Sequence, residues 1–195
     1  MAILNKTIIV ICEGRSERAY LQALKRFLRE QGSFINFVPK VVGKGNCKDV
    51  LKKYNEEKKK NRRSEFIIWV DDDLYFGNRD DTDRRCAEKY NLLTPNQQHL
   101  FKFSKHNFED FLVLHLEDEK LDLWKNICYK NDHFLRPMFS DKYEDLIREN
   151  IFPNYQKGEF PLEELTQAHL DNLFRHNCEP FESSFANYLE KILKP

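Results

Sequence analysis

The sequence predicts an α/β protein in which helices flank a parallel β-sheet, followed by a lobe made of helices. Two short apolar runs, residues 7–12 and 66–70, have the length and composition of strands buried on both faces, which are typical of a central parallel sheet. Between them, residues 17–31 place their apolar side chains on one helical face. We therefore expect an α/β domain over residues 1–117, with a helical C-terminal lobe over residues 118–195 packed on it.

Turn and capping residues divide the rest of the chain. Ser16, Asn46 and Asn107 are suitable N-caps for three helices, and Pro39 places its strand at or near a sheet edge. The other expected elements are strands at residues 34–42 and 99–103, and helices at residues 108–117, 121–129, 143–150, 162–176 and 181–193. No further strand is expected beyond residue 117.

Composition indicates a soluble protein of a reducing compartment. Charged residues make up 33% of the chain, and the mean hydropathy is -0.72. No apolar run approaches the ~20 residues that a membrane-spanning helix needs. The five cysteines form no CxxC pair, which argues against a disulfide framework or a zinc site. We expect a cytoplasmic protein with no membrane partner.

Charge is distributed unevenly along a chain whose net charge is zero. Residues 1–65 hold 16 Lys and Arg against 7 Asp and Glu, whereas residues 66–195 hold 16 against 25. A basic segment of this kind favours contact with a polyanion such as nucleic acid, although an ordinary solvated surface has the same composition. The candidate contacts for nucleic acid are Lys44, Lys48, Lys52, Lys59 and Arg62.

Acidic side chains follow two of the expected strands. Asp71, Asp72 and Asp73 come directly after the run 66–70, and Glu13 follows the first strand. Alternation along a strand places Asp71 and Asp73 on one side and Asp72 on the other. Carboxylates at the carboxyl ends of parallel strands are suited to a hard cation such as Mg²⁺. The alternative for the Asp run is a helix cap or a solvated turn.

This arrangement resembles the Toprim domain of topoisomerases, primases and OLD-family nucleases. The similarity is carried by residues 9–14 (IVICEG) with Glu17, and by residues 67–73 (IIWVDDD). The downstream part is similar to the RloB-like family of Toprim proteins through residues 108–115 (FEDFLVLH), 155–157 (YQK) and 180–184 (PFESS). The chain departs from the family at Phe111, where Trp is usual. The resemblance implies a Toprim-like, Rossmannoid sheet.

The resemblance also implies an activity and its partners. It implies a Mg²⁺-dependent endonuclease, with Mn²⁺ able to substitute, that acts in bacterial defence against phage, often beside an ATPase. The substrate would be RNA, including tRNA, or DNA. Asp71 and Asp73 would hold the metal, and Glu13 would share it or move a proton.

Four more side chains are candidates through the same resemblance. Glu17 and Glu109 would support catalysis or a further ion, although acids are common in the first turn of any helix. Lys157 would contact a substrate phosphate or stabilise charge in the transition state, and otherwise is a surface lysine. His115 would support the site indirectly, although a histidine on the apolar face of a helix is more often a hydrogen-bonded part of the core.

A second hypothesis comes from a different class of protein. The chain would then be a non-catalytic Toprim subunit that docks an ATPase partner or a nucleic acid. Primase-like nucleotidyl transfer is disfavoured because the sequence contains no separate template-binding module. The sequence leaves open whether the protein is a monomer or a homo-oligomer.

Overall fold

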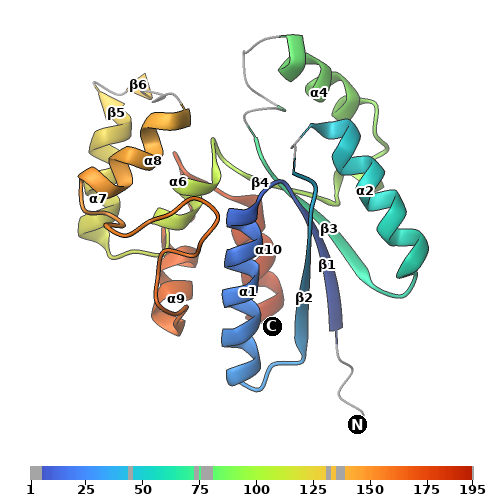
Figure 1. The fold of residues 1–195 in the computed structure, drawn as a ribbon, viewed down its shortest axis with the longest axis horizontal. Helices are drawn as coiled ribbons and strands as arrows, with labels where there is room; N and C mark the ends of the chain where they lie inside the picture. Colours follow the sequence, from blue (N-terminus) through green and yellow to red (C-terminus); the bar gives the residue numbers. More distant parts are fainter. Residues whose placement is uncertain are drawn as a thin grey trace.

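Four parallel strands form the sheet at the centre of the fold (Figure 1). The computed structural model describes residues 6–43, 46–72, 75, 81–130, 133–134 and 139–194. The strands, in the spatial order β2-β1-β3-β4, are β1 (Lys6–Cys12), β2 (Ile35–Val41), β3 (Glu65–Asp71) and β4 (Phe101–Ser104). This Rossmann-like α/β architecture confirms the expected fold class. Pro39 lies in β2 at the edge of the sheet, as predicted.

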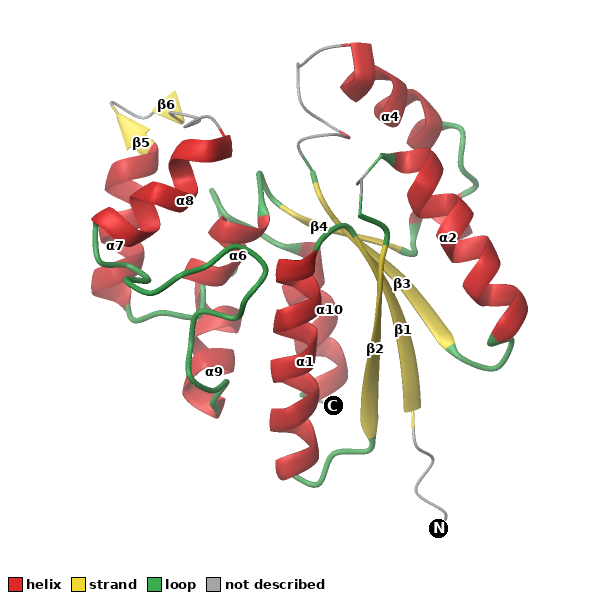
Figure 2. Ribbon diagram, in the orientation of Figure 1, coloured by secondary structure: helices red, strands yellow, loops and turns green. Residues whose placement is uncertain are grey.

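Helices cover both faces of the sheet (Figure 2). One face is covered by α1 (Arg15–Glu30) and α10 (Ser184–Leu193), and the other by α2 (Cys47–Lys60) and α4 (Asp81–Asn91). Because side chains alternate along each strand, the inner strands β1 and β3 supply apolar residues to a separate cluster on either face. Both strands are thus buried on both sides, which explains why their sequences are continuous apolar runs.

The strand order creates a switch point between β1 and β3. From β1 the chain crosses to β2 on one side, and from β3 it continues to β4 on the other. The connecting segments therefore diverge at the carboxyl ends of β1 and β3, where ligands of open α/β sheets gather. Cys12 pairs with Trp69 across these two strands, so Glu13 and Asp71 follow at neighbouring positions of this edge.

The remaining elements show where periodicity misplaced the boundaries. They are α5 (Pro95–Gln98), α6 (Phe108–Val113), α7 (Asp118–Cys128), β5 (Tyr129–Lys130), β6 (His133–Phe134), α8 (Phe139–Arg148) and α9 (Gln167–His176). The expectation of no strand beyond residue 117 was wrong, because β5 and β6 form a short antiparallel pair. α9 begins only after Thr166, whose hydroxyl accepts a hydrogen bond from the N–H of His169. Among the described residues, no helix has the length and apolar character required to cross a bilayer.

The last helix of the chain returns to the sheet. The ring of Phe185 in α10 stacks on Trp69 of β3 with centroids 4.0 Å apart, and the Trp69 indole N–H donates to the Ser104 hydroxyl. α10 therefore shares one apolar cluster with α1 and with residues of α6, α7 and α9. The domain boundary near residue 117 stays a prediction, and one apolar cluster contains residues from both sides of it.

His115 lies fully buried between α6 and α7. Its Nε2 lies 3.1 Å from the Tyr20 hydroxyl, and its Nδ1 lies 3.2 Å from the carbonyl oxygens of Phe111 and Leu112. Burial, with a smaller effect from His169, lowers the pKa of His115 to about 3. The ring is thus a neutral, hydrogen-bonded part of the core, which favours the core interpretation over a role at the site.

We expect His115 to reduce stability in acid. The unfolded state binds a proton at His115 below pH ~6.5 that the folded state does not accept until pH falls near 3. Between these values the free energy of unfolding should fall as pH falls, by up to ~1.4 kcal/mol per pH unit from this group. In His115→Asn, urea unfolding measured at pH 7, 6, 5 and 4 should show a shallower decline than in the wild type. The exposed His99→Asn is the control, and an unchanged decline in His115→Asn would contradict this account.

Candidate metal centre

Two of the predicted acids lie together at the switch point. Glu13 directly follows β1, and Asp71 is the last residue of the adjacent strand β3. Asp71 has the same alternation as Ile67 and Trp69, whose side chains pack toward α1. Asp71 therefore faces the start of α1.

A third carboxylate, Glu17, reaches the same place from the first turn of α1. Gly14, and not Ser16 as expected, is the N-cap of α1. The Gly14 N–H donates to Glu17 Oε2 at 3.1 Å and folds that side chain back over the end of β1. A Cβ atom on residue 14 would lie 3.0 Å from the same oxygen, so any other residue there would crowd the Glu17 carboxylate.

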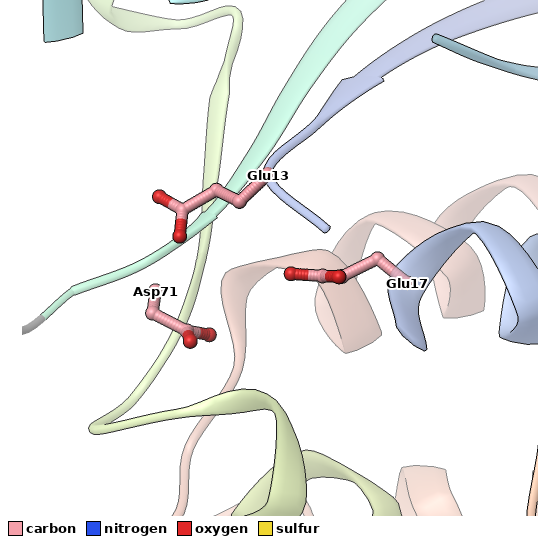
Figure 3. A group of neighbouring side chains, drawn as sticks. All are labelled: Glu13, Glu17 and Asp71. Atoms are coloured by element: carbon pink, nitrogen blue, oxygen red, sulfur yellow. The ribbon is translucent and has the colours of Figure 1, made fainter. Parts of the chain in front are cut away.

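The three acids form one compact group. Glu13, Glu17 and Asp71 each offer an oxygen, and these oxygens all lie within 4.8 Å of one another. Figure 3 shows the side chains converging from the loop after β1, the first turn of α1 and the end of β3. Oxygen donors with this separation suit a hard divalent cation such as Mg²⁺ or Mn²⁺. The donor set therefore fits the cation expected from the sequence.

The group opens into a cavity of about 360 Å³. Its walls come from the start of α1, the end of β3, the start of α6 and a loop that precedes α9. The lining residues are Glu13, Gly14, Arg15, Ser16, Glu17, Gly43, Asp71, Phe108, Glu109, Lys157 and Gly158. Carboxylates and the cationic side chains of Arg15 and Lys157 thus share one hollow.

Burial makes the negative charge of this cavity costly. It raises the pKa of Glu17 to about 7, and the neighbouring Glu109 carboxylate adds to this shift. Hydrogen bonds from the backbone and the charge of Lys157 oppose it. Burial also raises the pKa of Glu109, against the effects of Lys157 and of the Tyr155 hydroxyl, which donates to Glu109 Oε1 at 3.2 Å. The cavity accordingly favours occupation by positive charge.

The loop that carries Lys157 is fixed to the start of α1. The Gly158 N–H donates to the Ser16 hydroxyl at 3.0 Å, and Tyr155 is bound to Glu109 on the other side of Lys157. Gly158 has φ 95°, and a Cβ there would lie 3.3 Å from the Cβ of Arg15. Ser16 therefore holds the loop instead of capping the helix.

The structure brings together most, though not all, of the predicted site residues. Glu13, Glu17, Asp71, Glu109 and Lys157 line the cavity. His115 lies in the core and does not line it. Asp73 and Lys44 lie outside the described residues. Asp72 is absent from the cavity wall, as alternation predicted, and its Oδ1 accepts a hydrogen bond from the His106 N–H at 2.7 Å.

The predicted nucleic-acid contacts separate into two places. Lys48, Lys52 and Lys59 line a groove beside α2, whereas Arg62 lies in the turn between α2 and β3. That turn is at the amino end of β3, opposite the carboxylates. Arg62 is thus remote from the cavity along the sheet.

Sequence reasoning missed Arg15, Ser16 and Gly158 as parts of the cavity wall. Arg15 and Ser16 lie between Glu13 and Glu17, so their proximity to the acids was a usable signal. Gly158 follows Lys157, and a glycine after a candidate cationic residue is a signal for an unusual backbone conformation. The contact between Ser16 and Gly158 spans 142 positions, and no local pattern indicates it.

Fold and site together define an α/β protein with a carboxylate cluster at the switch point of a parallel sheet. The family model described as RloB-like protein matches residues 8–180. The chain belongs to the RloB-like family. No curated protein and no solved structure matches it significantly.

We expect the loop around Lys157 to depend on Gly158. Gly158→Ala should lower the free energy of unfolding by about 1–3 kcal/mol, because φ 95° strains a side-chain-bearing residue and the new Cβ crowds Arg15. Gly32→Ala is the matched control, since Gly32 has φ 69° but a Cβ there would meet nothing within 4 Å. Urea unfolding of both variants tests the contact with Arg15. Equal losses in the two variants would show that this contact contributes nothing.

Proposed function

We propose that this protein is a divalent-metal-dependent phosphodiesterase that cleaves nucleic acid. The observation that carries the proposal is the group formed by Glu13, Glu17 and Asp71, whose oxygens lie within 4.8 Å of one another at the carboxyl edge of the sheet. The presence of Arg15 and Lys157 in the same cavity supports it, because a phosphodiester would need cationic partners beside the metal ligands. The resemblance of the chain to Toprim nucleases supports the reaction class.

Each residue then has a separate task. Glu13, Glu17 and Asp71 would hold the cation, and Asp73 is predicted from the sequence to join them. When bound, Mg²⁺ or Mn²⁺ supplies a Lewis acid that polarises a phosphoryl oxygen and lowers the pKa of water. Lys157 would stabilise the negative charge on the non-bridging oxygens of the phosphate. Glu109, whose carboxylate accepts a hydrogen bond from the Tyr155 hydroxyl, would accept a proton.

The biological setting follows from family resemblance alone. RNA, including tRNA, and DNA are both candidate substrates, and the proposed role is that of an effector in bacterial defence against phage. An ATPase is the proposed protein partner. The rival function is a subunit that binds nucleic acid or the ATPase without catalysis, and the cleavage experiment below separates the two.

The metal is tested first, without any substrate. Mn²⁺ titrated into the protein and followed by calorimetry should bind the wild type and should bind Glu17→Gln with affinity reduced about 10-fold or more. Gly14→Ala should weaken binding as well, because the added Cβ displaces the Glu17 carboxylate. Glu30→Gln, at the exposed end of the same helix, is the control. Equal affinity in Glu17→Gln and the wild type would remove Glu17 from the site.

Cleavage is the second test. The wild type incubated with labelled tRNA, single-stranded DNA and duplex DNA should cut at least one of them with Mn²⁺ or Mg²⁺ and none with EDTA. Asp71→Asn and Glu13→Gln should cut about 100-fold more slowly or not at all, because each removes a charged ligand. Circular dichroism checks that they fold, and Glu30→Gln should cut as the wild type does. Undiminished cleavage by Asp71→Asn would refute the assignment.

If the wild type cuts none of the three substrates, the assay is repeated in the presence of the proposed ATPase partner. Binding without cleavage under both conditions would favour the non-catalytic subunit.

A further inference from the structure

A basic groove lies outside the carboxylate cavity, on the face of the sheet that α2 and α4 cover. An open groove of about 840 Å³ runs beside α2 and is bordered by α4. Its lining residues are Lys48, Leu51, Lys52, Asn55, Glu56, Lys59 and Lys89. Four lysines against one glutamate make this groove strongly positive. Three of the four come from α2 and the fourth from α4.

The six lysines of α2 differ in what surrounds them. Lys53 and Lys60 lie 3.3 and 3.9 Å from the buried Glu57 carboxylate, which Lys40 also contacts at 3.3 Å. Lys58 lies over the ring of Tyr54 at 5.3 Å from its centroid. These three lysines are thus occupied by groups of the protein itself.

The other three lysines of α2 all face the groove. In the part of the chain that the structure describes, no ion pair involves Lys48, Lys52 or Lys59. Their charges are therefore available to an external anion. The division within one helix separates lysines that contact groups of the protein itself from lysines that present charge to a ligand.

The row has the dimensions of an extended polyanion. A rise of 1.5 Å per residue spreads Lys48, Lys52 and Lys59 over about 16 Å of α2. One strand of a duplex advances about 3.4 Å per phosphate along its axis, so the row spans about five phosphates. A small anion would fill only one part of such a groove, whereas a nucleic-acid backbone matches its length.

The direction of the row connects it with the cavity. Gly43 lines the carboxylate cavity, and α2 begins four residues later at Cys47. Lys48 therefore lies near the carboxyl edge of the sheet, and Lys59 lies toward the opposite edge. A nucleic-acid strand bound along α2 would therefore extend toward the edge of the sheet where Glu13 and Asp71 lie.

We propose that the groove between α2 and α4 binds the phosphate backbone of a nucleic acid and guides it to the carboxylate cavity. This inference rests on the proposed function for the class of its ligand and adds the path that the ligand takes. Lys89 joins Lys48, Lys52 and Lys59 as a contact, and Lys53, Lys58 and Lys60 are excluded from it. An acidic protein segment would be attracted by the same charges, and the experiment separates it from nucleic acid.

Two variants with the same change in net charge test the groove. The groove variant is Lys48→Gln with Lys52→Gln and Lys59→Gln, and the control variant is Lys53→Gln with Lys58→Gln and Lys60→Gln. Lys40 still pairs with Glu57 in the control. Circular dichroism and thermal unfolding verify both folds. Fluorescence anisotropy in EDTA then measures the binding of labelled RNA and duplex DNA of about 20 nucleotides, across a NaCl series.

We expect the groove variant to lose about 10-fold or more in affinity at about 0.1 M NaCl. Its slope of log K against log[NaCl] should become shallower by about two to three, because each phosphate contact contributes ~0.7–0.9. The control variant should keep the affinity and slope of the wild type. Equal losses in both variants, or no loss in either, would overturn the groove as a specific contact.

The remaining outcomes separate this inference from the proposed function. Labelled poly-glutamate is the probe for an acidic partner. If it binds through the groove lysines while neither nucleic acid binds, the occupant is protein and the inference is wrong. Groove-dependent nucleic-acid binding without cleavage in Mn²⁺ would uphold the inference and count against the proposed nuclease. If the wild type cleaves nucleic acid and the groove variant binds it as tightly as the wild type does, the proposed nuclease is supported and the groove is overturned as its binding path.

Discussion

Mutual repulsion among Glu13, Glu17 and Asp71 is the interaction that the rest of this site must compensate. Three carboxylates whose oxygens lie within 4.8 Å of one another repel each other in a partly buried cavity unless positive charge or N–H groups face them. The surrounding structure supplies both, through the Gly14 N–H and the ammonium of Lys157. The remaining imbalance makes the cavity a place for a cation.

The helices beyond the sheet contribute to this compensation. Lys157 comes from the loop before α9, and that loop is held by Ser16 at one position and by Glu109 at another. The same part of the chain returns through Phe185 to stack on Trp69, two residues before Asp71. The C-terminal region therefore both completes the cavity wall and packs behind the strand that carries one of its acids. A sheet without these helices would present the acids to solvent and lack the lysine.

Local sequence was sufficient for some of these features and insufficient for others. Continuous apolar runs identified β1 and β3 because both faces of these strands are buried, and their ends located Glu13 and Asp71. Glu17 was ambiguous because an acid in a first turn is favoured by the helix dipole alone, and only the Gly14 contact distinguishes its orientation. The place of Lys157 depends on contacts across 142 positions, which periodicity does not encode. The predicted helix boundaries were wrong where an N-cap residue such as Thr166 sets the start of the helix.

The lysines of α2 also show that local sequence does not reveal what a side chain contacts. Composition marks the whole segment as basic, and the sequence treats its lysines alike. Their roles diverge because the helix turns about 100° per residue, which directs Lys53 toward the buried Glu57 and Lys52 into the groove. A charge that faces a buried carboxylate stabilises the fold, whereas a charge that faces an open groove attracts a ligand from solution. Surroundings, more than residue type, thus separate the structural cations from those that meet a polyanion.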